Sequence, residues 1–414
     1  MGQRVETPGS MFVWIPRYAY KITNNTVEIE FLYGNTNNFL SVTEVITTNE
    51  EGTEKTDYVE KMQDILQKEG YRVHPSFTNG ENNNYANGEW DKEIEGFWAA
   101  KYVAGYQSST ITYDANGQEV YPEIENIIYS NKTYTSYNNE YTQNALGQNI
   151  SSTSYSTQKI SYPVFKPLTY AYNLISVGDS YAISQEIAKT SYLYGLNSNN
   201  TDSHMMKNSE WGAIAYLAHS KYGRNGIEIV ANTKNLNNKD GKNIYAVTGY
   251  AGTQANGTAA SSTNNITGVF DLNGCLWEAV AAYISNGSDI LTTNGNLLNP
   301  IKSSDSTAYQ TNSTKYVTIY PFNESADTSN NNWSRYNELK TLQYGYGDSI
   351  LETSSAGEGY TSWNNDHSEF AYLNRPFFIR GGSFGSQATN GGTFAFYSSD
   401  GSINHYMGFR VVLI

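Results

Sequence analysis

The stretch GVFDLNGCLWE, residues 268–278, is the part of the chain from which its fold is predicted. It carries apolar residues after each of two glycines, Gly268 and Gly274, and it ends on the pair Trp277 and Glu278. Trp277 is a candidate for the core, because aromatic side chains bury large areas. Glu278 is a candidate partner for Arg380 or Arg410, since an arginine beside glycines near a buried strand usually pairs with a carboxylate. The stretch therefore predicts a central element of a scaffold.

Further motifs stand on both sides of this stretch. In chain order they are FVWIPRY at 12–18, GFWAAKY at 96–102, PV at 163–164, SEW at 209–211, RGGS at 380–383 and GFRV at 408–411. Taken together, in this order and spacing, the motifs resemble those of the formylglycine-generating-enzyme-like branch of the C-type lectin fold. Within that branch the chain most resembles the ligand-binding variable proteins that retroelements diversify in bacteria and their phages.

This resemblance implies an α+β fold of the C-type-lectin-like (formylglycine-generating-enzyme-like) kind, with two main helices, short twisted strands and long loop insertions. We expect a single elaborated domain over residues 1–414, with a C-terminal ligand-binding segment at 380–414. We expect insertions at 106–160 and 285–360, which are rich in Ser, Thr, Tyr and Asn and show little amphipathic pattern. Such composition is typical of surface loops or accessory hairpins. The chain departs from the family at Val103, where relatives often carry Glu.

The composition favours amides and hydroxyls over charges. Only 16% of the 414 residues are charged, while 36 Tyr, 15 Phe and 7 Trp supply enough aromatic area for a packed core. The net charge of −14 argues against nucleic-acid binding, which needs basic faces. No apolar run is long enough for a membrane span. No signal peptide is visible, so we expect a piece of a longer secreted protein or a phage structural protein, placed on a bacterial cell surface or a virion.

Three segments have the pattern of helices. Residues 58–66 place apolar side chains on one helical stripe, with Gly70 as a stop. Residues 168–175 also share an apolar face. The clearest helix is 209–222, which has a serine at its start and Gly223 at its end. Asn-Gly pairs recur along the rest of the chain and predict hairpin or loop tips, because they supply the positive φ angles of tight turns.

No arrangement of residues predicts an enzyme. The enzyme of the resembled branch depends on cysteines that bind copper, but this chain has one cysteine, Cys275, where relatives carry Asn or another small residue. A lone buried thiol is usually an inert small hydrophobe. GGSFG at 381–385 matches the Gly-x-Ser-x-Gly pattern of hydrolases, but no helix follows it and His405 is the single downstream histidine. We therefore expect neither oxidase nor hydrolase activity.

The sequence also predicts no cofactor and no dedicated metal site. The five histidines form no His-Glu-x-x-His or short His-x-His pair. DANG at 114–117 begins like a calcium loop but lacks the later glutamate of that loop, so it predicts a hairpin turn. A structural calcium ion held by loop carbonyls and carboxylates stays open as an alternative, because such a site needs no fixed spacing.

The segment 380–414 mixes apolar positions with the residues of adaptable binding surfaces. Five positions are expected to point into the core: Phe394, Phe396, Phe409, Val411 and Leu413. Between them, Tyr offers contact area at small entropy cost, and Ser and Asn offer flexible hydrogen bonds. In the variable proteins that the chain resembles, adenine-directed mutagenesis rewrites codons in this block. The expected ligand-binding residues are Ser383, Phe384, Ser386, Gln387, Thr389, Asn390, Thr393, Tyr397, Ser399, Asp400, Ser402, Asn404, His405 and Tyr406.

These observations predict a non-enzymatic protein that binds a cell-surface protein or a glycan through a diversifiable face on a rigid scaffold. Aromatic anchors tend to dominate interface energy, so Phe384, Tyr397, His405 and Tyr406 are the expected hot spots. The alternative is a structural surface or virion component, such as a pilus tip or tail fibre, that acts by self-assembly through the long insertions. A cryptic enzyme is a third alternative, against which stands the lack of a converging nucleophile, base and orienting group.

Overall fold

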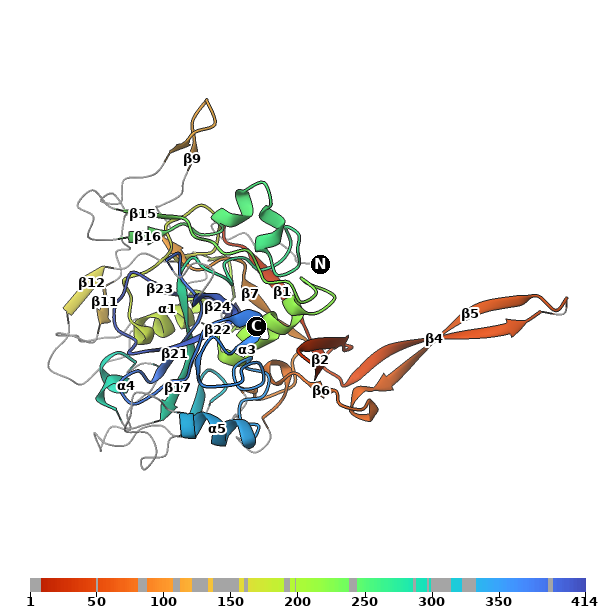
Figure 1. Cartoon of the computed structure of the whole chain (residues 1–414). Coiled ribbons are helices and arrows are strands. Elements are labelled where there is room, and N and C mark those ends of the chain that lie inside the picture. The colour runs from red at the N-terminus through yellow and green to blue at the C-terminus, as the bar shows by residue number, and fades with distance from the viewer. Residues whose placement is uncertain are drawn as a thin grey trace.

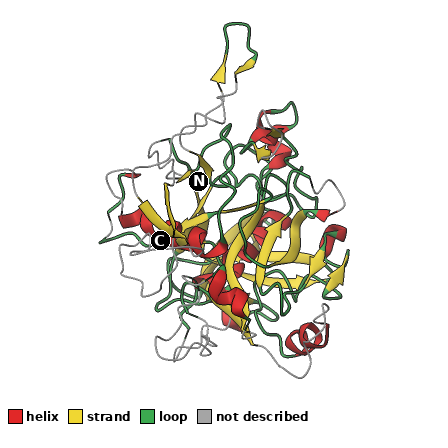
Figure 2. Ribbon diagram, turned by 90° about the vertical axis from the view of Figure 1, so that its left-hand side faces the viewer, coloured by secondary structure: helices red, strands yellow, loops and turns green. Residues whose placement is uncertain are grey.

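The computed structural model describes residues 9–49, 51–80, 88–106, 112–120, 133–136, 156–159, 163–189, 194–197, 199–237, 244–285, 288–295, 298, 314–321, 333–385 and 390–414. Over these ranges the chain has a mixed α+β fold with few helices and many short strands, which confirms the predicted class (Figure 1; Figure 2). Two sheets hold most of the core, and a narrow two-stranded arm projects from the body (Figure 1). No helix in these ranges is both long and apolar enough to cross a membrane.

The first sheet brings together strands from distant parts of the chain. Its order is β1 (Phe12–Pro16), β7 (Gly96–Ala100), β24 (Val411–Leu413) and β14 (Ser203–Met205), all antiparallel. Ala99 of β7 lies opposite Val13 on one side and opposite Val412 on the other. Core side chains cover both faces of this sheet, which explains why the predicted strands at 12–18 and 96–102 are apolar at almost every position.

The second sheet is the larger one and it is curled. Its order is β18 (Thr318–Pro321), β17 (Trp277–Ser285), β21 (Phe377–Gly381), β22 (Gly392–Ser399), β20 (Ser368–Glu369) and β19 (Glu358–Gly359), and β23 (Met407–Phe409) pairs with the start of β17. The register between β17 and β21 shifts between Ala279 and Tyr283. Such an irregularity increases local twist. Residues 268–278 lead directly into β17, the most central strand, as their apolar pattern predicts.

The main helices are α1 (Val177–Lys189) and α3 (Asn208–His219), with shorter helices α4 (Asp289–Thr293) and α5 (Trp333–Thr341). The helix predicted at 209–222 is found as α3, but it begins at Asn208 and ends at His219, with Lys207 and Ser220 as the cap residues in place of the predicted Ser209 and Gly223. Its first turn is fixed by Glu210, whose Oε2 accepts a hydrogen bond from the main-chain N–H of Lys207 at 2.9 Å. Trp211 is fully buried beneath the second sheet, and its Nε1 donates to the main-chain oxygen of Thr393 at 2.9 Å.

The helix predicted at 168–175 is wrong. The segment is irregular, and Leu168 and Leu174 have positive φ angles of 60° and 57°. Its main chain is instead bonded to other loops: the N–H of Leu168 donates to the oxygen of Thr248 at 2.7 Å, and that of Leu174 to the oxygen of Asn404 at 2.9 Å. Tertiary hydrogen bonds have overridden the local helical pattern, and α1 begins only at Val177.

The helix predicted at 58–66 is also wrong, because this segment belongs to the projecting arm. The arm consists of β4 (Asn38–Thr48) and β5 (Glu54–Asp64), which pair along their full length. At its tip Asn49 Oδ1 accepts hydrogen bonds from the N–H groups of Glu51 and Thr53. One face of the arm carries five exposed apolar side chains: Leu40, Val42, Ile46, Tyr58 and Met62. An apolar stripe predicts a helix only if the stripe packs against a core. The arm extends away from the core, so this reasoning does not hold for residues 58–66 (Figure 1).

A small sheet connects the arm to the body. It has the order β3 (Thr26–Phe31), β2 (Tyr18–Thr23) and β6 (Arg72–Val73). The remaining strands are short: β8 (Gly105–Tyr106), β9 (Thr112–Tyr113), β10 (Glu119–Val120), β11 (Thr133–Ser136), β12 (Ser156–Lys159), β13 (Pro163–Val164), β15 (Asn235–Asn237) and β16 (Ile244–Ala246). Between β9 and β10, Asp114 Oδ1 accepts from the N–H groups of Asn116 and Gln118, each at 2.8 Å, so the predicted hairpin turn is confirmed.

The two predicted insertions differ in their described parts. Within 106–160 the structure describes two isolated strand pairs, β9–β10 and β11–β12. Within 285–360, by contrast, β18, α5 and residues 344–354 contribute buried side chains to a core cluster with Phe378 and Phe396 of the second sheet. This second range is therefore more than a set of surface loops. Whether either range is an insertion into a smaller domain stays a prediction.

A buried histidine links the small sheet to α3. His74 has no exposed surface, and its ring lies 5.3–5.9 Å from the rings of Tyr18, Tyr20, Phe77 and Tyr216. Burial lowers the pKa of His74 to about 3, because the cation would be desolvated there. The folded state therefore keeps His74 neutral well below pH 6.5, where the unfolded chain already binds the proton.

This linkage predicts a loss of stability in mild acid. The neutral His74 contributes fully to the free energy of unfolding above pH 6.5, and this contribution is lost progressively as the pH falls toward 3. The free energy of unfolding should therefore fall by about 2 kcal/mol between pH 7 and pH 5. Urea unfolding of wild type and His74→Asn at both pH values measures it. In the wild type, the main-chain N–H of Ser76 donates a hydrogen bond to His74 Nδ1 at 3.3 Å, and the side-chain oxygen of asparagine can accept the same bond. An equal pH dependence in both proteins would contradict this prediction.

Candidate functional site

The segment 380–414 is held to the body by two buried arginines. Arg410 forms a two-point ion pair with Glu278, with Nη2 to Oε1 at 2.6 Å and Nε to Oε2 at 2.8 Å. Its guanidinium also donates to the main-chain oxygens of Ala100 and Phe270. The predicted pairing of an arginine with Glu278 is confirmed for Arg410, which thereby ties the C-terminal strands to β7, to residues 268–278 and to β17.

Arg380 does not pair with Glu278. Its side chain is fully buried, and it donates to the main-chain oxygens of Ala395, Asp348 and Ser349, to Ser349 Oγ and to Asn208 Oδ1, at 2.7–3.1 Å. Burial lowers the pKa of Arg380 to about 10, so the side chain stays charged at pH 7. The five bonds fix β22, α3 and the 348–349 turn in one arrangement.

The inward positions of this segment are as predicted. Five apolar side chains are between 0% and 3% exposed: Phe394, Phe396, Phe409, Val411 and Leu413. They belong to β22, β23 and β24 and enter the core clusters on both sides of the two sheets. The strands β22, β23 and β24 are therefore anchored at alternate positions, whereas half of the predicted binding residues lie in the segment between Phe396 and Phe409.

The predicted binding residues fall into three groups. Four are exposed (Asn390, Asp400, Asn404 and Tyr406) and four are half-buried (Tyr397, Ser399, Ser402 and His405). Three are buried, namely Ser383, Phe384 and Thr393. Ser386, Gln387 and Thr389 lie outside the described residues. The expectation that the whole set is exposed is thus wrong for the buried three. Thr393 points inward because its N–H and Oγ1 both donate to Glu228 Oε1, at 3.0 and 2.7 Å.

Two groups of ring contacts come together where β17 begins. Around β22, Tyr397 lies 5.7 Å from Trp277 and 4.9 Å from His367, and His367 lies 5.6 Å from the exposed Tyr360. Around the loop before β23, Tyr406 stacks on Phe384 at 5.1 Å and contacts His405 at 4.2 Å. The main-chain N–H of Trp277 donates to the oxygen of Tyr406 at 2.9 Å, which joins the groups. We call these seven residues the aromatic patch: Trp277, Tyr360, His367, Phe384, Tyr397, His405 and Tyr406.

Charged groups stand beside the aromatic patch. The guanidinium of Arg375 lies 5.8 Å from the centre of the Tyr397 ring, and its Nη1 donates to the Tyr397 hydroxyl at 3.5 Å. Glu369 lies 3.9 Å from Arg375, and burial raises its pKa. Burial also lowers the pKa of His367, whose ring nitrogens have no hydrogen-bond partner in the described part of the chain. The patch therefore combines flat apolar faces with a cation and a carboxylate at its rim.

Three members of the patch were missed from the sequence. Trp277 is predicted as core, but it is half-buried at the start of β17. Tyr360 and His367 lie in the range predicted as a loop insertion or just after it, and they reach Tyr397 because β20 pairs with β22. No periodicity links positions so far apart in the chain. The one available signal was the density of aromatic residues in this part of the chain.

Cys275 is fully buried and burial raises the pKa of its thiol well above the usual value, so a reactive thiolate is disfavoured. No group of three His, Cys, Asp or Glu side chains in the described ranges could hold a metal ion. The rings and polar edges of the patch can supply stacking and hydrogen bonds.

No model of a known protein family matches the chain, and no curated protein matches it either.

Proposed function

We propose that this chain is a non-enzymatic binding protein of the C-type-lectin-like kind, displayed on a bacterial surface or a phage particle, and that it contacts its ligand through the aromatic patch. The observation that carries the proposal is the patch itself. Tyr406 is exposed and Tyr397 and His405 are half-buried, and Arg380 and Arg410 hold the neighbouring strands β22 and β24 in place. Rigid aromatic anchors give large contact area at small entropy cost.

The proposed fold is supported by the order of elements. The first described strand and the last one share a sheet through β7, two main helices lie between them, and β17 follows the 268–278 stretch. These elements carry the motifs whose order resembles the formylglycine-generating-enzyme-like branch. The proposed ligand is a cell-surface glycan or protein, because ring faces stack on sugars and on apolar protein surface alike.

The binding test uses two truncations within the patch. Tyr397→Ala combined with Tyr406→Ala should weaken binding by about 2–4 kcal/mol, which is about 30- to 1000-fold, because aromatic hot spots dominate interface energy. The probes are an array of bacterial glycans and a panel of intact bacterial strains, exposed to the fluorescently labelled chain. The matched control is Tyr33→Ala with Tyr58→Ala, which removes two exposed tyrosines distant from the patch in the chain. Unchanged affinity in the first double variant would contradict the proposal.

Diversification of the face is tested separately in the gene. The last 35 codons are sequenced across a natural population, and the neighbouring DNA is searched for an imperfect copy. Substitutions confined to adenine positions of that copy, and falling on residues such as Asn390, Asn404 and Tyr406, are the expected result. An invariant segment without a copy would leave a fixed binding domain and remove the proposed kinship with the variable proteins.

The projecting arm favours a second candidate function, self-assembly as a structural surface or virion component. Its exposed apolar face is what an interface between subunits would use. Changing Val42, Ile46 and Tyr58 together to Thr, a good strand former, should then convert an oligomer into a monomer in size-exclusion chromatography. A wild-type chain that is already monomeric would contradict this second function.

A further inference from the structure

The 400–406 loop connects β22 to β23 and carries five predicted binding residues: Asp400, Ser402, Asn404, His405 and Tyr406. Residues 400–406, all of which the structure describes, contain no helix or strand, so their main-chain groups need other partners. Five of the seven main-chain oxygens accept hydrogen bonds from outside the loop, namely those of Asp400, Gly401, Asn404, His405 and Tyr406. The loop is therefore attached to the body through its main chain.

Three of these bonds come from residues 173–177. They are Asn173 Nδ2 to the oxygen of His405 at 3.0 Å, Leu174 N–H to that of Asn404 at 2.9 Å, and Val177 N–H to that of Gly401 at 3.0 Å. The residue number of the donor rises as that of the acceptor falls, so the two segments run antiparallel. Gly401 has a φ angle of 73°, and a Cβ added there would lie 2.7 Å from the ring of Phe377. The loop thus packs closely against β21 as well.

Another donor comes from the end of α4. Asn294 is the C-terminal cap residue of this helix, and its Nδ2 donates to the oxygen of Asp400 at 2.8 Å. The main-chain oxygen of Asn294 accepts from the N–H of Gly178, in the first turn of α1, at 2.8 Å. One residue therefore joins α4, α1 and the loop.

Side chains of the loop itself also shape it. Asp400 Oδ1 accepts from the N–H of Ser402 at 3.0 Å, and Asn404 Oδ1 accepts from the N–H of Tyr406 at 2.7 Å. These two bonds are local turns that bend the chain over a few residues, and they stay within the loop. The placement of the His405 and Tyr406 rings relative to the rest of the aromatic patch therefore depends on the outside donors.

We propose that Asn173 and Asn294 are positioning residues for ligand binding, because their side-chain amides hold the 400–406 loop in place. Each amide nitrogen faces a main-chain oxygen, which only a donor can satisfy. Asn173 is fully buried, so it acts on a ligand only through the loop. The effect on binding rests on the function proposed above, whereas the effect on the loop does not.

The first test variant is Asn294→Asp, which keeps the shape of the side chain and replaces the donor by an acceptor. Hydrogen–deuterium exchange of the full chain, followed by mass spectrometry, measures its effect. Exchange at Leu174 and Val177 should become about tenfold faster or more, because their N–H groups donate to loop oxygens. Exchange in β17 and β21 should stay unchanged, whereas a general loss of stability would accelerate it there as well.

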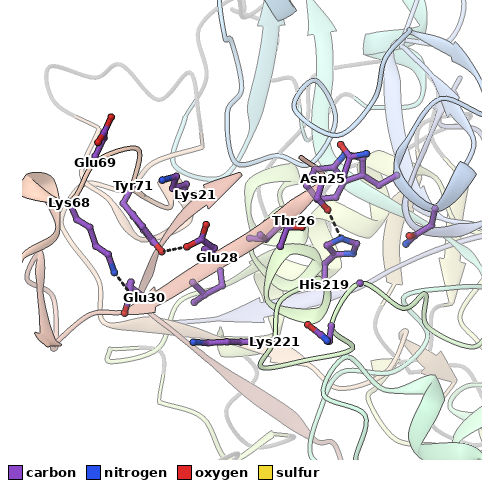
Figure 3. A pocket seen from close by; sticks show the side chains of 16 residues that line it. Lys21, Asn25, Thr26, Glu28, Glu30, Lys68, Glu69, Tyr71, His219 and Lys221 are labelled. Carbon is purple, nitrogen blue, oxygen red and sulfur yellow. Dashed lines mark hydrogen bonds and ion pairs between the residues drawn. The ribbon is translucent and has the colours of Figure 1, made fainter. Parts of the chain in front are cut away.

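The matched control is Asn25→Asp, the same substitution in the small sheet. Asn25 is exposed at the turn between β2 and β3, and His219 Nε2 contacts its main-chain oxygen at 3.0 Å (Figure 3). This control should change neither the exchange at Val177 nor the binding. Two further test variants, Asn173→Leu and Asn294→Ala, remove an amide without adding a charge, and both should accelerate exchange at Val177.

Ligand affinity is measured with the glycan or bacterial strain to which the wild-type chain binds most strongly. Asn294→Asp should weaken this binding about fivefold or more, because the loop is no longer held in its binding conformation. Unchanged exchange at Val177 in both Asn294 variants would overturn the proposal, and so would faster exchange with unaltered affinity. An affinity that survives Tyr397→Ala with Tyr406→Ala would contradict the proposed function instead. The exchange measurement needs no ligand and still decides whether the amides hold the loop.

Discussion

Replacing Glu278 by Gln should lower the free energy of unfolding by about 3–5 kcal/mol, because the guanidinium of Arg410 would remain buried without a countercharge. Glu278 is 1% exposed and Arg410 is fully buried, so water cannot replace the lost carboxylate. The substitution preserves side-chain volume, and packing loss therefore contributes little. Burial raises the pKa of Glu278 to about 7, so urea unfolding is followed by tryptophan fluorescence at pH 8.5, where the carboxylate is charged.

The matched control is an ion pair on the surface. Lys315 Nζ and Asp91 Oδ2 are 2.7 Å apart, but these side chains are 35% and 57% exposed. Solvent screens such pairs, so Asp91→Asn should cost less than about 1 kcal/mol. Equal losses in the two variants would show that burial does not govern the strength of the Arg410–Glu278 pair.

The second large effect is expected for Arg380→Met, which should also cost about 3–5 kcal/mol. Methionine fills part of the space but donates no hydrogen bond. The main-chain oxygens of Ala395, Asp348 and Ser349 would then be buried without this donor, and each unsatisfied group costs about 1–3 kcal/mol. Because Ala395 lies two residues before Tyr397 on β22, ligand binding through the aromatic patch should weaken as well.

Arg375→Met provides the comparison. Arg375 is the same residue type five positions earlier, and its side chain is 44% exposed. Its removal should change the free energy of unfolding by less than about 1 kcal/mol. Urea unfolding measures the free energy of unfolding of both variants. A comparable decrease in both would contradict the assignment of Arg380 as the buried residue that holds β22.

The parts of the fold that the sequence predicts correctly are those whose partners are local or chemically constrained. Helix α3 follows from an apolar stripe that does face a core, with Trp211 buried within it. Chemistry predicts that Glu278 pairs with an arginine, but the choice of Arg410 over Arg380 comes only from the fold, because the buried Arg380 is held by main-chain oxygens, Ser349 and Asn208. The inward positions of β22 to β24 follow from large apolar residues set among glycines.

The failures have different physical causes. Residues 58–66 carry apolar side chains with helical spacing, but the arm exposes most of them. The helix prediction assumed that these side chains are buried, and it fails for that reason. Residues 168–175 are bent by bonds to Thr248 and Asn404, partners that no local pattern reveals. Phe384 is buried because its N–H donates to the oxygen of Cys275 at 2.8 Å, which draws the loop onto the body.

The pairing of β7 with both β1 and β24 has a consequence for how the protein is made. During synthesis β24 leaves the ribosome about 310 residues after β7, since the two strands lie at Val411–Leu413 and Gly96–Ala100, at a rate of about 5–20 residues per second. Until then one edge of β7 has no partner strand, and contacts of such long sequence separation form slowly. The residues of the aromatic patch in β22 and before β23 belong to the same late segment. The nascent chain therefore completes its proposed binding surface long after β1 and β7 have been made.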